Sequence, residues 1–217
     1  GSQQFAISFE TNDTIRLIDQ NGGTTQGLYD TTAVYRDSSA WYHIVVACDT
    51  TNATASDRVK LYVNGARVTN FSTTDNWPLN YNTSVNNTVR ALIGVQRPNS
   101  SGTLNAYLDG YLAEVNLIDG QALDATAFGE TNEDTNQWQA IEYTGSYGTN
   151  GFYLKFQDSS ALGDDSSGNT NDFTVNNLVA TDQVLDSPTN NFATLNSVAP
   201  DTTGTTSHSF SEGNLKV

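Results

Sequence analysis

Apolar and polar side chains alternate with a period close to two along most of this 217-residue chain. The run from Phe5 to Glu10 shows the alternation most clearly, and the most apolar run lies between Trp41 and Cys48. Such alternation is typical of β-strands with one buried face, because successive side chains on a strand point to opposite faces. No long stretch repeats its apolar positions at the helical period. The pattern therefore predicts an all-β protein made of many short strands.

Turn-forming residues separate these expected strands. Asn64-Gly65 stands between two alternating runs, and Asn-Gly is the preferred pair for a two-residue type I′ hairpin. Many short strands with such turns indicate an antiparallel β-sandwich of the jelly-roll kind. Beyond Asp186 only short apolar pieces remain among Thr, Ser and Asn. We therefore expect a β-sandwich over residues 1–185, and an extended tail or linker toward a further domain over 186–217.

The net charge of the chain limits the classes of partner that we expect. Nine Lys and Arg stand against 24 Asp and Glu, which gives a formal net charge of −15. An acidic protein repels phosphate backbones, so nucleic acid is not an expected partner. No apolar run approaches the roughly 18 residues that span a bilayer, so membrane insertion is not expected either. The single cysteine, Cys48, lies in an apolar run and is interpreted as a small buried hydrophobic side chain.

Several short segments follow one another in a particular order. They are Trp41-Tyr42-His43, Asp49, Leu61-Tyr62-Val63-Asn64-Gly65, Ile93-Gly94, Gly110-Tyr111-Leu112-Ala113-Glu114-Val115 and Ala122-Leu123. This ordered set resembles the laminin G-like domains of the concanavalin A-like lectin/glucanase superfamily. The resemblance covers about residues 41–123 and implies a concanavalin A-like jelly roll.

The resemblance also implies a function. Laminin G-like domains mostly bind glycans or proteins, whereas the glucanases of the superfamily use two carboxylates on one strand face. Glu114 and Asp119 are an odd number of positions apart, which puts them on opposite faces of a regular strand. The sequence therefore predicts a non-enzymatic binding module whose ligand is carbohydrate.

The chain is also similar to large virion proteins of tailed phages of marine bacteria, in which such a domain lies inside a longer chain. That similarity implies an extracellular place on the virion surface, in a tail, fibre or decoration protein, and adhesion to glycans of a host cell surface. Neighbouring virion subunits, or further copies in a homo-oligomer, are alternative partners. In that case the protein would be a structural fibre or filament subunit that assembles through strand exchange, with no glycan ligand.

A long polar connection after residue 71 carries the candidate ligand-binding residues. Trp77 and Tyr81 could stack on the faces of sugar rings, because aromatic side chains on loops offer apolar surface beside polar groups. The hydrogen-bonding groups for sugar hydroxyls would come from Asp75, Asn76, Asn80 and Asn82. The alternative is that Trp77 folds back and caps the hydrophobic core.

A second polar segment, residues 164–172, carries the candidate metal ligands. Asp165, Asn169 and Asp172 could supply oxygen atoms to Ca²⁺, the one cofactor that the sequence suggests. Their spacing does not match an EF-hand loop. Asx turns, in which a side chain accepts a hydrogen bond from a nearby backbone N–H, account for the same residues without a metal.

Overall fold

The computed structural model describes residues 3–96 and 104–188. Its contacts divide the chain into two compact units, each assembled from segments that are far apart in the sequence. The first unit consists of Gly1–Arg36, His43–Gly110 and Gln121–Gly129, and the second of Asp37–Tyr42, Tyr111–Gly120 and Glu130–Val217. The tail expected over 186–217 lies almost wholly outside the described residues.

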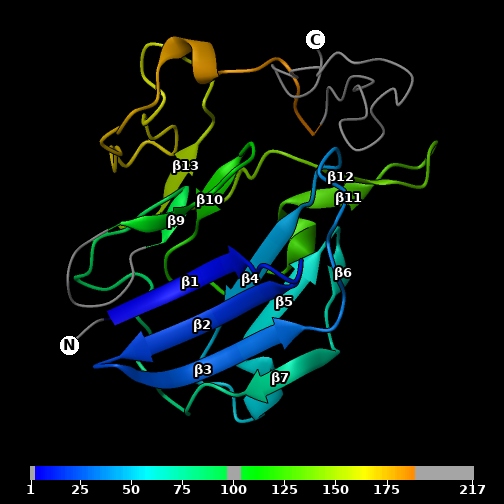
Figure 1. Ribbon diagram of the computed structural model, residues 1–217, viewed down its shortest axis with the longest axis vertical. Coiled ribbons are helices and arrows are strands. Elements are labelled where there is room, and N and C mark those ends of the chain that lie inside the picture. Colours follow the sequence, from blue (N-terminus) through cyan, green and yellow to red (C-terminus); the bar gives the residue numbers. More distant parts are fainter. Residues whose placement is uncertain (1–2, 97–103, 189–217) are drawn as a thin grey trace, which may run out of the picture. The chain divides into compact units, whose positions relative to one another are not determined.

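The first unit contains two main antiparallel sheets (Figure 1). One sheet has the order β1-β2-β3-β7 and is formed by β1 (Gln3–Phe9), β2 (Ile15–Asn21), β3 (Thr24–Thr31) and β7 (Phe71–Asp75). The other has the order β4-β5-β6 and is formed by β4 (Ile44–Cys48), β5 (Val59–Val63) and β6 (Ala66–Arg67). The remaining elements are β8 (Val95–Gln96), β9 (Asn105–Tyr107) and the 3₁₀ turns η1 (Ala55–Asp57) and η2 (Ala125–Ala127). The predicted antiparallel all-β fold is confirmed.

The hairpin predicted at Asn64-Gly65 is also confirmed. It joins β5 to β6 and places Val63 opposite Ala66. Asn64 and Gly65 have φ angles of 49° and 79°, and a type I′ turn requires positive φ at both central positions. Oδ1 of Asn64 accepts a hydrogen bond from the N–H of His43 at 2.8 Å, which ties the hairpin to the start of β4.

Three alternate residues of β2 are completely buried in the core of the first unit. Ile15, Leu17 and Asp19 are each 0% exposed, and the residues between them are only partly buried. In the second sheet, Val59 and Leu61 show the same alternation on β5. The period of two that the sequence shows is therefore the period at which side chains enter the core.

Gly27 of β3 leaves the space that Trp77 fills. A Cβ atom at position 27 would overlap the ring atoms Cδ2, Cε2 and Cε3 of Trp77. We expect Gly27→Ala to lower the free energy of unfolding by about 1–3 kcal/mol, because overpacking a core forces side chains from their preferred positions. Chemical denaturation followed by circular dichroism measures the loss.

Gly110→Ala is the matched control for this prediction, because a Cβ atom there meets no other atom within 4 Å. The control is expected to unfold like the unchanged protein. If Gly27→Ala were as stable as Gly110→Ala, the indole of Trp77 would not occupy the space beside β3.

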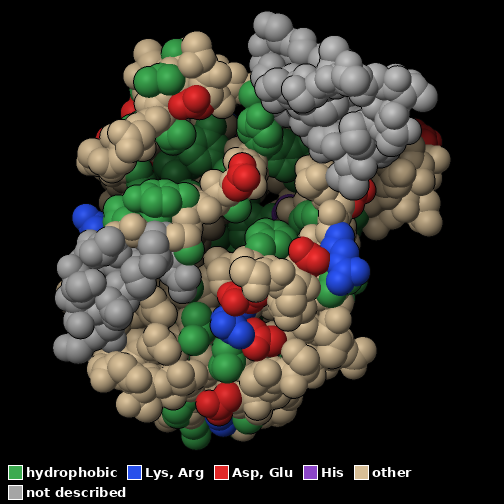
Figure 2. Space-filling view, viewed as in Figure 1, with side chains coloured by type: hydrophobic (Ala, Val, Ile, Leu, Met, Phe, Trp, Pro, Cys, Tyr) green, Lys and Arg blue, Asp and Glu red, His purple; other side chains and the backbone are tan. Residues whose placement is uncertain are grey.

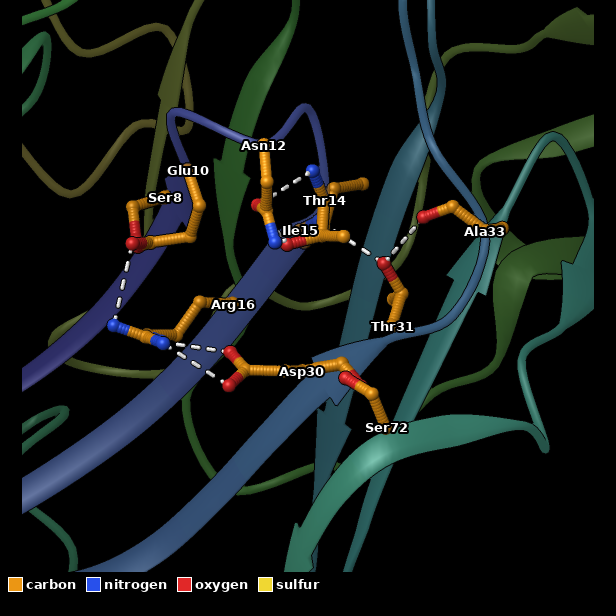
Figure 3. Close-up of polar contacts among 10 residues, drawn as sticks. All are labelled: Ser8, Glu10, Asn12, Thr14, Ile15, Arg16, Asp30, Thr31, Ala33 and Ser72. Carbon is orange, nitrogen blue, oxygen red and sulfur yellow. Dashed lines mark hydrogen bonds and ion pairs between the residues drawn. The ribbon is translucent and has the colours of Figure 1, made fainter.

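The outer face of the four-stranded sheet carries a charged network (Figure 3). Nε and Nη2 of Arg16 donate to the two carboxylate oxygens of Asp30 at 2.7 and 3.0 Å. Nη1 of Arg16 lies 3.2 Å from Oε2 of Glu10, whose other oxygen accepts from the hydroxyl of Ser8 at 2.8 Å. A bidentate arginine–carboxylate pair has a fixed geometry. The network therefore helps to hold β1, β2 and β3 in register.

The second unit has its own small core. β10 (Val115–Leu117) pairs with β13 (Phe152–Leu154), and the remaining elements are β11 (Gly129–Thr131), β12 (Trp138–Ala140) and the 3₁₀ turn η3 (Ala180–Asp182). All three residues of β13 are buried, as is Leu162. Nε1 of Trp41 donates to Oδ2 of Asp186 at 3.0 Å, so the first residue of the apolar run at 41–48 belongs to this unit and not to β4.

Among the described residues, no helix has the length and apolar character that crossing a membrane requires.

Candidate functional site

Trp77 lies in the core of the first unit, with 0% of its surface exposed. Its ring centroid is 6.0 Å from that of Phe5 and 5.0 Å from that of Tyr29. Its Nε1 donates to Oδ2 of Asp19 at 3.4 Å. A ring enclosed in this way offers no face to a sugar. The stacking role expected of Trp77 is therefore corrected, and the alternative that the sequence left open, folding back into the core, is the observed one.

The buried carboxylate of Asp19 holds the base of the loop that follows β7. It accepts hydrogen bonds from the N–H and hydroxyl of Ser84 at 3.2 and 2.9 Å, and from the hydroxyl of Tyr81 at 3.4 Å. Burial raises the pKa of Asp19 above its ordinary value, and the hydrogen bonds from Ser84, Trp77 and Tyr81 oppose that rise. Asp19 therefore fastens both ends of the segment 77–84 to β2.

The other candidate ligand-binding residues divide into two groups. Asn76 and Tyr81 are half-buried and point into the unit, because Oδ1 of Asn76 accepts from the hydroxyl of Tyr29 at 2.6 Å and the hydroxyl of Tyr81 reaches Asp19. Asp75, Asn80 and Asn82 are exposed, and Leu79 between them is 51% exposed. The exposed group is the one that a ligand in solution can reach.

A second loop, residues 49–57, lies against the first. The N–H of Asn80 donates to the carbonyl of Thr50 at 2.8 Å, and the hydroxyl of Thr50 donates to the carbonyl of Tyr81 at 2.7 Å. Asp49 and Thr51, on either side of Thr50, are exposed. We use the name loop surface for six exposed side chains, which come from the two loops and from the last residue of β7: Asp49, Thr51, Asp75, Leu79, Asn80 and Asn82.

Arg58 fixes both loops, and sequence reasoning missed it. Its Nη1 donates to the carbonyl of Trp77 at 2.8 Å, and its Nε to the carbonyl of Asn52 at 2.9 Å. Nη2 donates to the carbonyl of Ala53 at 3.2 Å. The sequence offered only a weak signal for this role. Because the chain has only nine basic residues, an arginine placed directly before an apolar strand was a candidate for structural contacts.

Cys48 is the last residue of β4 and is half-buried. Burial, together with the negative charges of Asp19 and Asp49, raises its pKa to about 11. The thiol therefore stays protonated at neutral pH, and a protonated thiol is a poor nucleophile.

The candidate metal ligands lie in the second unit, where Asp165 accepts four hydrogen bonds. Oδ1 accepts from the N–H groups of Tyr153 and Ser167, both at 2.8 Å. Oδ2 accepts from the N–H of Asn171 and from the hydroxyl of Ser167, both at 2.9 Å. Burial alone would raise the pKa of Asp165, but the hydrogen bonds from Ser167, Tyr153 and Asn171 outweigh it and lower that pKa.

Asn169 and Asp172 also have hydrogen-bonding roles within the protein. Nδ2 of Asn169 donates to the carbonyls of Gly148 and Gly151 at 2.6 and 2.9 Å, and Oδ1 of Asp172 accepts from the N–H of Asp165 at 2.9 Å. Of the three candidate ligands, only Asp165 forms an Asx turn, in which its Oδ1 accepts from the N–H of Ser167 two residues on. The contacts of Asn169 and Asp172 join positions that are further apart in the sequence. Calcium binding by this segment stays a prediction.

Acidic side chains are scattered over the face of the protein shown in Figure 2. In the part of the chain that the structure describes, no three His, Cys, Asp or Glu side chains form a group that could hold a metal ion.

The fold and the loop surface define a class: an antiparallel β-sandwich that carries exposed polar groups on loops between its strands. The family model Laminin_G_3, described as the concanavalin A-like lectin/glucanases superfamily, matches residues 1–127. The match spans more than half of the chain, and the chain belongs to this family. Comparison with curated proteins and with solved structures gives no match.

The match covers both sheets of the first unit and both loops of the loop surface. Most of the second unit, from residue 130 onward, lies outside it. Domains of the laminin G-like type are generally non-catalytic binding modules, although the superfamily includes glycosidases. Membership therefore suggests carbohydrate binding for the first unit.

Proposed function

We propose that the protein binds carbohydrate without cleaving it, through the loop surface of the first unit. The observation that carries the proposal is the family match over residues 1–127, which includes every strand that positions the two loops. The chemistry of the surface supports it, because Asp75, Asn80 and Asn82 offer carboxylate and amide groups that hydrogen-bond to hydroxyls. Leu79 supplies apolar area for the C–H face of a sugar ring.

The test removes the exposed amides without disturbing the fold. Asn80 has a φ angle of 55°, so Asn80→Gly removes the side chain and keeps a backbone that glycine adopts readily. We expect the double variant Asn80→Gly, Asn82→Ala to weaken glycan binding about tenfold or more, because each lost hydrogen bond contributes roughly 0.5–1.5 kcal/mol. Titration calorimetry with a glycan identified on an array measures the change.

Asn176→Ala in the second unit is the matched control, since Asn176 is an exposed asparagine outside the family match. It is expected to leave the affinity unchanged. Equal affinities of the double variant and the control for the same glycan would place the binding site elsewhere and contradict the proposal.

We also propose a setting, which rests only on the resemblance of the sequence to virion proteins of tailed phages. We place the module on a virion surface, outside the cell, where its ligand would be a polysaccharide of the host cell surface and its role adhesion. Purified protein is then expected to bind intact host cells and to be displaced by the polysaccharide isolated from them. Binding that the free polysaccharide does not compete away would contradict this setting.

A further inference from the structure

The chain contains three Asn-Gly pairs, at Asn21-Gly22, Asn64-Gly65 and Asn150-Gly151. Such a pair can change its own covalent structure, because glycine has no side chain to keep its backbone nitrogen away from the side-chain amide of the asparagine. The nitrogen attacks the amide carbon Cγ, and the displaced NH₂ group leaves with the proton of the glycine N–H as ammonia. Water then opens the resulting succinimide ring to aspartate or isoaspartate. Since the three dipeptides are identical, their surroundings decide which of them reacts.

The pair Asn21-Gly22 lies in the exposed turn between β2 and β3. Asn21 stands opposite Thr24, so Gly22 and Gly23 form a two-residue turn, with φ angles of 64° and 84°. A Cβ atom on either glycine would meet no other atom within 4 Å, and the residues from Asn21 to Thr24 are all exposed. The N–H of the first residue in such a turn takes no part in the strand ladder. The nitrogen of Gly22 therefore lies in an open turn without side chains, where it can approach Cγ of Asn21.

The side chain of Asn21 is held only by other side chains. Its Oδ1 accepts a hydrogen bond from Nε2 of Gln3 at 3.0 Å, and this pair is exposed. Burial raises the pKa of the Tyr81 hydroxyl, and a contact with the side chain of Asn21 opposes that rise, so the two groups are close. Water replaces exposed hydrogen bonds between side chains at little cost. The amide of Asn21 can therefore turn toward Gly22.

Asn64-Gly65 is also a turn, but its asparagine is held by the backbone. Oδ1 of Asn64 accepts from the N–H of His43 at 2.8 Å, and the N–H of Asn64 donates to the carbonyl of His43 at 2.8 Å. A backbone group cannot turn away by itself, because it moves only with the start of β4. The amide carbon of Asn64 is therefore fixed where it bonds to His43, and the ring can close only after this contact opens.

At Asn150-Gly151 both residues are held in place. Nδ2 and the backbone N–H of Asn150 donate to Oδ2 of Asp119, at 3.2 and 3.1 Å. Gly151 is buried, and a Cβ atom there would overlap the carbonyl oxygen of Tyr147. The carbonyl of Gly151 accepts from Nδ2 of Asn169 at 2.9 Å. The peptide group between Asn150 and Gly151 therefore cannot rotate to bring the nitrogen onto Cγ.

We propose that Asn21 is a site of spontaneous modification, at which the folded protein converts a side-chain amide into the carboxylate of aspartate or isoaspartate. Asn64 and Asn150 stay intact over the same time. The new carboxylate lies close to the hydroxyl of Tyr81, which is 3.4 Å from Oδ1 of the buried Asp19. Isoaspartate also adds a methylene group to the main chain at the end of β2. The modified protein is therefore expected to be less stable than the original one, because like charges repel and the turn is displaced.

The test is peptide mapping by mass spectrometry after the full chain has been kept folded at mildly alkaline pH. A gain of one mass unit reports the change from amide to acid, and methylation by an isoaspartate-specific methyltransferase reports isoaspartate. We expect the peptide with Asn21 to react about tenfold faster or more than those with Asn64 and Asn150, the factor that one hydrogen bond of ordinary strength provides. In chain unfolded by guanidinium chloride, the three peptides should react at similar rates.

Asn21→Gln is the matched variant, because glutamine keeps the amide while its longer side chain closes the corresponding ring much more slowly. Its unfolding midpoint is expected to stay constant during the incubation, whereas that of the unchanged protein falls. Equal rates at the three pairs in the folded chain would overturn the proposal. An Asn21 that reacts only in the unfolded chain would also overturn it, as would an equal loss of stability in Asn21→Gln.

Discussion

Trp77→Ala is expected to lower the free energy of unfolding by about 3–5 kcal/mol, which is the usual cost of truncating a buried aromatic residue to alanine. The indole is 0% exposed and packs between Phe5 and Tyr29. Its removal also takes one hydrogen-bond donor from the buried Asp19 carboxylate. Domains of this size have total stabilities of about 5–15 kcal/mol, so the variant would lose a large part of its stability. Chemical denaturation followed by circular dichroism measures the change.

Leu79→Ala is the matched control, because Leu79 lies two residues further along the same loop and is 51% exposed. Its effect is expected to stay within about 0.5 kcal/mol. If Trp77→Ala and Leu79→Ala had equal unfolding midpoints, the indole would not be a core residue. Because Trp77 supports the loop surface from beneath, loss of glycan binding in Trp77→Ala would report unfolding and not a lost stacking contact.

Asp165→Asn is expected to destabilise the second unit by about 1–3 kcal/mol, the cost of leaving a partly buried polar group without its partner. Both oxygens of Asp165 accept from backbone N–H groups: Oδ1 from Tyr153 and Ser167, and Oδ2 from Asn171. An amide has only one oxygen. Whichever way its side chain is turned, at least one backbone N–H then faces an NH₂ group. Thermal unfolding measured by circular dichroism detects the loss.

Asp19→Asn is the same chemical change in a different setting, and it is expected to cost much less. Oδ2 of Asp19 accepts from Nε1 of Trp77 and the N–H of Ser84, so an amide oxygen can replace it. Oδ1 accepts from the hydroxyls of Ser84 and Tyr81, which can rotate and accept from an NH₂ group instead. If Asp19→Asn were as destabilising as Asp165→Asn, hydrogen-bond matching would not explain the roles of the two carboxylates.

The contributions of Asp165 and Asp19 to the stability of the protein change with pH in opposite directions. The pKa of Asp165 is lowered, so its contribution to stability is present above the ordinary aspartate pKa and is lost as pH falls through the folded-state value. The pKa of Asp19 is raised, so its contribution is present below the ordinary value and is lost as pH rises through the folded-state value. Asp165→Asn should therefore reduce the loss of stability in acid, and Asp19→Asn should not.

Local sequence signals predicted the features that depend on neighbouring residues. The hairpin at Asn64-Gly65 follows from the tolerance of both residues for positive φ, and the buried face of β2 follows from alternation alone. The burial of Trp77 could not be predicted from local sequence signals. Its burial depends on the space beside Gly27 and on the carboxylate of Asp19, which lie 50 and 58 residues earlier. No local pattern relates those three positions.

The candidate sites were predictable to different degrees for the same reason. That the loop after β7 carries exposed polar groups could be inferred from composition, and Asn80 and Asn82 are exposed there. The contribution of residues 49–57 could not, because it depends on hydrogen bonds between Thr50 and the distant Asn80 and Tyr81. At Asp165, the clustering of Asp and Asn indicated a polar turn, but only the structure shows that β13 supplies one of its donors.

Binding without turnover is the property that most directly tests the proposed function. The measurement is a glycan array probed with the full chain, followed by an assay for new reducing ends on every glycan that binds. We predict binding to at least one class of glycan, weakened in the Asn80→Gly, Asn82→Ala variant, with no release of reducing ends during prolonged incubation. Release of reducing ends, or a folded protein that binds no glycan, would contradict a non-enzymatic carbohydrate-binding module.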